Sequence, residues 1–179
     1  MAPPQAMQPP PQWLMEAFGK LPPALQQRAK VLLMKVMKDQ YLPALSMLPL
    51  AWLLIYIPHV VKTRAILQKR RLMDYNIVTP RSEDPDAYGY PTSELIKRAC
   101  GCHYNGFESF APFAAAVILC KVQKAKPMEV AKLSLRFVLF RILYTVFYLV
   151  GRRKFIAYLR PIAWAGSIHS IWRLFAIAL

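Results

Sequence analysis

The sequence predicts an all-α protein: an integral membrane four-helix bundle, preceded by a proline-rich arm and an amphipathic helix at the membrane interface. Hydrophobic residues fill 56% of the 179 positions and charged residues fill 18%. An average soluble domain has about 45–50% apolar and about 25% charged residues, so this composition is typical of a membrane protein. No charge interrupts the stretch from Tyr41 to Val61, which is long enough to cross about 30 Å of hydrocarbon.

The charge balance indicates an anionic partner. The chain has 24 Lys and Arg against 9 Asp and Glu, a formal net charge of +15. A nucleic-acid-binding domain collects its basic residues on a solvated face, whereas here they flank long apolar runs. Lipid headgroups therefore fit the charge better, and no nucleic-acid partner is expected.

Residues 1–40 are predicted to form a separate N-terminal part. The first 23 residues are rich in proline and contain no arginine, which favours an extended arm over a secretory signal. Residues 24–38, ALQQRAKVLLMKVMK, place leucine and valine on one helical face and basic residues largely off it. This helix is too short and too charged to span, so we expect it to lie along the interface or against a partner helix.

Residues 41–179 are predicted to form the membrane domain. Four apolar runs separated by basic turns predict spanning helices near 41–64, 92–123, 127–151 and 156–178. The one long polar connection, residues 74–94, lies between the first two helices.

Polar residues recur at helical spacing within these spans. Insertion of a charged side chain into the membrane costs about 2.5–3.5 kcal/mol, so each such residue needs a partner or a water-filled cavity. One interpretation is a cleft for an anionic small molecule, with Arg donating and Glu accepting hydrogen bonds. The other is a Glu108–Arg141 pair with Asn105 holding the helices together. The polar positions are Arg98, Gly101, Asn105 and Glu108 on the second helix, Arg141, Tyr144 and Tyr148 on the third, and Arg160 on the fourth.

The cysteines do not predict a metal centre. Cys100, Cys102 and His103 lie together, but on a helix the two thiols would point about 200° apart. No second pair of ligands is present in the sequence to complete a tetrahedral site. We therefore expect no bound metal.

Four segments resemble motifs of one known family. Residues 90–120, YPTSELIKRACGCHYNGFESFAPFAAAVILC, resemble the second-helix signature of the MAPEG family, the membrane-associated proteins in eicosanoid and glutathione metabolism. Residues 141–148, RILYTVFY, match its third-helix motif, and residues 159–164, LRPIAW, are similar to the opening of its fourth helix. Residues 74–81, DYNIVTPR, resemble a loop of a bacterial-type branch. The resemblance covers about residues 41–179.

The resemblance implies a homotrimer that binds glutathione between neighbouring subunits. Matched by position, Asn105, Glu108 and Tyr148 would contact the tripeptide, and Arg160 would stabilise or activate its thiolate as the catalytic residue. The remaining members of the implied binding set are Arg98, Arg141 and Tyr144.

Three positions depart from the family pattern. Glutathione-using members usually carry Arg at the position of Gly101, some carry Arg at the position of Tyr104, and Ser commonly stands where this chain has Pro161. Two functions therefore stay open: a glutathione-dependent transferase or peroxidase acting on lipophilic substrates, and a non-catalytic subunit of a larger membrane complex such as a respiratory or ATP synthase assembly. The membrane would be the mitochondrial inner membrane or the endoplasmic reticulum.

Overall fold

The computed structural model describes residues 22, 23, 25–28, 31, 34, 38–69, 78, 79, 84–151 and 153–179. The proline-rich arm and most of the predicted amphipathic helix lie outside these residues. Contacts divide the chain into two compact units, Met1–Leu42 and Pro43–Leu179. The described part is all-helical and contains no strand. Its elements are α3 (Leu42–Leu45), α4 (Met47–Leu67), the short 3₁₀ helix η2 (Pro85–Tyr88), α5 (Thr92–Val122), α6 (Pro127–Val150) and α7 (Lys154–Ala178).

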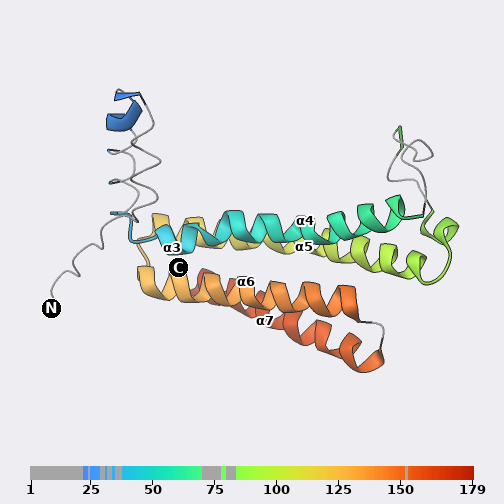
Figure 1. The fold of residues 1–179 in the computed structure, drawn as a ribbon. Helices are drawn as coiled ribbons and strands as arrows, with labels where there is room; N and C mark the ends of the chain where they lie inside the picture. Colours follow the sequence, from blue (N-terminus) through green and yellow to red (C-terminus); the bar gives the residue numbers. More distant parts are fainter. Residues whose placement is uncertain are drawn as a thin grey trace. The chain divides into compact units, whose positions relative to one another are not determined.

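The four long helices pack side by side in two main pairs. Helix α4 runs along α5, and α6 runs along α7 (Figure 1). Helix α5 also contacts α6 and α7, and α4 contacts α6. Side chains from α5, α6 and α7 can therefore meet in one place.

Two helical stretches are long and apolar enough to cross a membrane, Leu42–Leu67 and Pro127–Val150. Only 22% and 33% of their apolar windows are buried inside the chain, so they are not the core helices of a soluble protein. The other two predicted spans, in α5 and α7, are less apolar because they carry polar and charged residues. The first half of α5 is polar, and α7 carries Arg160 and Arg173.

Small residues and stacked rings join the helices closely. The rings of Phe113 on α5 and Phe137 on α6 stack with their centroids 3.8 Å apart, and both side chains are fully buried. At Gly166 on α7, an added Cβ would come within 2.6 Å of the Phe140 ring on α6. At Gly106 on α5, an added Cβ would lie 3.0 Å from the side chain of Ile55 on α4. Such close approach of small residues is how helices associate in lipid, where the hydrophobic effect gives little help.

The short helix η2 packs against the end of α4 and the start of α5. Tyr88 of η2 is buried against Ile66 of α4 and Ile96 of α5. An ion pair of 2.7 Å between Lys97 and Asp86 joins α5 to η2 at the surface. The start of α5 is therefore held to the end of α4.

Candidate binding groove at α5, α6 and α7

An open groove of about 400 Å³ is lined by side chains from α5, α6 and α7. This volume lies within the range of about 300–1,000 Å³ for small-molecule sites. Four of the seven residues predicted from the sequence line it. The lining residues are Asn105 on α5, Tyr144 and Tyr148 on α6, and Ala157, Arg160, Pro161 and Trp164 on α7.

Asn105 connects the groove to a buried arginine. Arg141 on α6 is only 5% exposed, and its Nη1 donates to Asn105 Oδ1 at 2.8 Å. The Asn105 Nδ2 in turn donates to Glu108 Oε2 at 3.3 Å. Among the described residues, Asn105 thus stands between Arg141 and Glu108, in place of the direct Glu108–Arg141 pair of one of the two interpretations. Glu108 itself is exposed on the single chain and does not lie inside the bundle.

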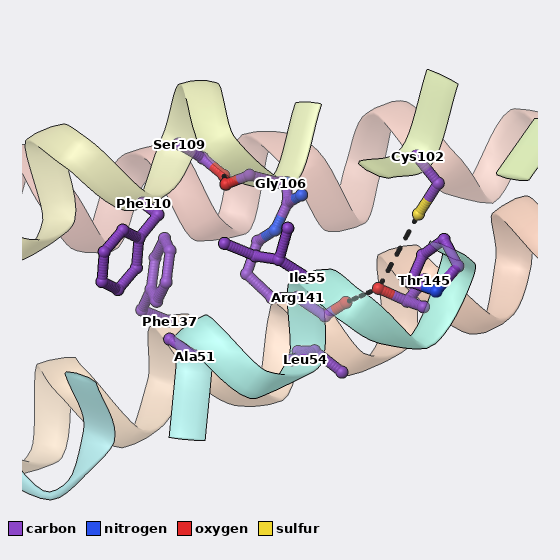
Figure 2. Close-up of a pocket in the computed structure, with 11 residues that line it drawn as sticks. Ala51, Leu54, Ile55, Cys102, Gly106, Ser109, Phe110, Phe137, Arg141 and Thr145 are labelled. Atoms are coloured by element: carbon purple, nitrogen blue, oxygen red, sulfur yellow. Dashed lines mark hydrogen bonds between the residues drawn. The ribbon is translucent and has the colours of Figure 1, made fainter. Parts of the chain in front are cut away.

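Arg141 is fixed from several sides and does not line the groove. Its guanidinium carbon lies 4.4 Å from the centroid of the Tyr144 ring. Figure 2 shows it beside a small cavity of about 10 Å³, about the size that one water requires. In the same view, the hydroxyl of Thr145 donates to Arg141 O at 2.8 Å and lies 3.9 Å from the thiol of Cys102. Arg141 therefore anchors α6 to α5 and holds Asn105 in position.

Arg160 lies over an aromatic ring at the groove. Its guanidinium carbon is 4.7 Å from the centroid of the Tyr148 ring, a cation–π contact. The Nε donates to Ala157 O at 3.3 Å in the preceding turn of α7. Among the described residues, the two Nη groups of Arg160 have no hydrogen-bond partner. They are the donors that an anionic ligand would use.

Gly101 makes room for Tyr148. A Cβ added at Gly101 would lie 2.7 Å from the Tyr148 hydroxyl, closer than real Cβ atoms approach. The Tyr148 ring also contacts Tyr144, with centroids 5.3 Å apart. The phenol of Tyr148, from the neighbouring helix, thus fills the space that a side chain at position 101 would take.

Arg98, the remaining member of the predicted set, does not line the groove. Its Nε is buried without a hydrogen-bond partner among the described residues. The sequence interpretation missed the contributions of Ala157 and Pro161 to the groove wall. Both lie within one turn of Arg160 on α7, so helical spacing from Arg160 was the signal that could have identified them.

No group of three or more His, Cys, Asp or Glu side chains in the described part of the chain could hold a metal ion. All three cysteines are free thiols. Cys102 and Cys120 are buried, and Cys100 is partly exposed. Cys120 donates from its sulfur to Leu174 O at 3.2 Å, which joins α5 to α7.

The fold and the groove define an all-helical membrane protein whose polar and aromatic side chains meet where three helices converge. The chain matches the MAPEG family over residues 43–179 and belongs to that family. The resemblance seen in the sequence is thereby confirmed for most of the chain, while the bacterial-type branch stays a prediction. MAPEG proteins are associated with glutathione in general and typically form membrane-embedded trimers. No curated protein and no solved structure matches the chain.

Proposed function

We propose that the protein is a membrane enzyme that binds glutathione, or a related thiol, in the groove and transfers it to a lipophilic electrophile. The observation that carries this proposal is the meeting of Asn105, Tyr144, Tyr148 and Arg160 at one open groove. Together they offer a guanidinium, two phenols and an amide. This set can bind a carboxylate, an amide and a sulfur anion.

Arg160 is the residue proposed to act on the sulfur. A thiol attacks as its thiolate, and an adjacent guanidinium favours that form by lowering the thiol pKa. In the reaction the thiol proton goes to water, a C–S bond forms, and the leaving group departs with its electron pair. Arg160 would stabilise the negative charge on sulfur before the bond forms. Reduction of a lipid peroxide by the thiol is the second reaction that the family resemblance implies.

The other groove residues would position the two reactants. Asn105 is held by Arg141, so its amide is oriented before a ligand arrives. Pro161 and Trp164 form the apolar part of the wall. An electrophile dissolved in the bilayer would approach along this part.

The exposed position of Glu108 supports assembly as a homotrimer. A charged side chain within the bilayer costs about 2.5–3.5 kcal/mol, and one hydrogen bond from Asn105 leaves most of the carboxylate open. A second copy of the chain, or the glutathione held between copies, would cover it. Trimeric assembly is typical of the family.

A second candidate function is that of a non-catalytic subunit in a larger membrane complex, for example in a respiratory or ATP synthase assembly. The contact between Tyr148 and Gly101 favours it, because the groove lacks an arginine that glutathione-using relatives usually have. Each charge-assisted hydrogen bond lost to a ligand removes about 1.5–3 kcal/mol. Location in the mitochondrial inner membrane or the endoplasmic reticulum stays a prediction.

Titration calorimetry of the detergent-purified protein with glutathione tests the proposal. We expect saturable binding that Arg160→Ala weakens. Arg173→Ala serves as the matched control, because Arg173 is an exposed arginine on the same helix outside the groove. Absence of binding at millimolar glutathione would reject the enzyme and leave the accessory subunit.

A further inference from the structure

We infer that the small cavity between α4, α5 and α6 binds one ordered water, which links Arg141 to the backbone of α4. This interior cavity has a volume of about 10 Å³, and its walls include Leu54 and Pro58 of α4, Cys102 of α5, and Arg141 and Thr145 of α6 (Figure 2). A volume of about 10–15 Å³ is enough for one water molecule. The walls belong to a single chain, so the inference holds for a monomer and a trimer alike and is independent of the proposed enzyme activity.

Arg141 supplies the hydrogen-bond donors at the cavity. A guanidinium has five N–H groups, and among the described residues the Arg141 side chain donates one hydrogen bond, from Nη1 to Asn105 Oδ1. The side chain is buried, and no carboxylate in the described part of the chain forms an ion pair with it. A charged side chain at membrane depth without a direct counter-ion requires water beside it. The interior cavity provides the space for that water.

The backbone of α4 supplies an acceptor at the same cavity. Pro58 is fully buried inside α4 and has no backbone N–H, so the helix provides no donor four residues on for Leu54 O. Leu54 and Pro58 both line the cavity. A buried carbonyl without a donor is costly, and one water that accepts from Arg141 and donates to Leu54 O satisfies both groups.

The hydroxyl of Thr145 supplies a second acceptor. It donates its own proton to Arg141 O at 2.8 Å, which leaves a lone pair for a hydrogen bond from water. A water in the cavity therefore accepts one bond, from Arg141, and donates two, to Leu54 O and Thr145 Oγ1. Ordered buried waters typically form about three hydrogen bonds, so these partners complete the site.

The water connects α4 to the groove through Arg141. Helix α4 contributes no side chain to the groove wall, whereas Asn105 does and is held by Arg141. A water that bonds to both Arg141 and Leu54 O fixes the guanidinium from the side of α4. The orientation of the Asn105 amide then depends on three helices, α4, α5 and α6.

Radiolytic hydroxyl-radical labelling of the full chain in detergent tests the inference. A short X-ray pulse converts water to hydroxyl radicals in place, and a radical formed inside the cavity oxidises the side chains that line it. Cys102 and Cys120 are a matched pair, because both are buried and Cys102 lines the cavity whereas Cys120 does not. We expect several-fold more oxidation of Cys102 than of Cys120, measured by mass spectrometry of peptides.

Two results would overturn the inference. Equal oxidation of Cys102 and Cys120 in the native protein would show a dry cavity, and this result needs no variant. Reaction of Cys102 with methyl methanethiosulfonate in the folded protein would show that bulk water reaches it. Ala51→Val should fill the cavity and lower the oxidation of Cys102, while Ala65→Val, at a similarly buried alanine of α4 outside the cavity, should not.

Pro58→Ala tests the backbone acceptor. The substitution returns an N–H to α4, and this group bonds to Leu54 O and removes one partner of the water. The oxidation of Cys102 should therefore fall. Pro49→Ala is the control, because a backbone N–H in the first turn of α4 has no carbonyl of the helix to bond. Oxidation that stays the same or rises in Pro58→Ala would overturn the link between Arg141 and α4.

Discussion

The hydroxyl of Tyr148 on α6 lies against Gly101 on α5, in the space that a side chain at position 101 would fill. A larger side chain at position 101 therefore requires a shift or a substitution of Tyr148. An arginine at position 101 is compatible with the groove only if the phenol of Tyr148 moves.

Gly101→Ala should destabilise the fold by about 1–3 kcal/mol, the usual cost of overpacking a well-packed contact. The new methyl group meets the Tyr148 hydroxyl oxygen first, so most of the loss should disappear in a Tyr148→Phe background. Chemical denaturation of the four proteins in detergent, analysed as a double-mutant cycle, measures the coupling. A loss of equal size in both backgrounds would contradict the contact.

Asn105→Ala should destabilise the fold by about 1.5–3 kcal/mol, because it removes the acceptor of a buried arginine. Asn105→Asp should cost less, since a carboxylate can still accept from Arg141. Tyr104→Ala, at the exposed neighbouring position, is the control and should be nearly neutral. Thermal unfolding in a fixed detergent compares them, and equal losses for all three would argue against an anchoring role for Asn105.

Arg160→Ala should lower a thiol-transfer rate by about 100-fold or more while the melting temperature stays the same, because the interaction is made with developing charge. Arg160→Lys should recover part of the rate, since it restores the charge without the forked donors. Single-turnover assays with glutathione and an electrophilic lipophile measure both. An unchanged rate in Arg160→Ala would remove Arg160 from the proposed reaction.

Glu108→Gln should change assembly if a second copy of the chain covers this position. Loss of the charge should shift the subunit equilibrium, because a cation or a ligand that neutralises Glu108 loses its partner. Cross-linking in micelles, read as the fraction of trimer, measures the shift. Glu129→Gln, at the exposed start of α6, is the control. Trimer fractions that stay equal across all three proteins would place Glu108 outside the subunit interface.

The helical fold could be predicted from the sequence because its signals are local. The uncharged stretch from Tyr41 to Val61 and the basic turns gave helix positions close to α4, α5, α6 and α7. The family motifs also grouped Asn105, Tyr144, Tyr148 and Arg160, and these four side chains line one groove in the structure. These inferences needed only the geometry of a single helix or a family motif.

Contacts between helices could not be predicted in the same way. The sequence alone suggested that Glu108 pairs with Arg141, whereas the rotation of α5 against α6 places Asn105 between them. The contact of Tyr148 with Gly101 depends on how closely α5 and α6 approach each other. No single-helix pattern reports that distance, so the meaning of Gly101 became clear only from the packed structure.

The unequal burial of the three thiols allows one position of the native protein to be labelled selectively. Cys102 and Cys120 are 2% and 0% exposed, whereas Cys100 is partly exposed on α5. A maleimide fluorophore applied to the folded protein should therefore attach at one position without any engineered cysteine. Because Cys100 directly precedes Gly101 on α5, the emission of the fluorophore would report changes close to the groove.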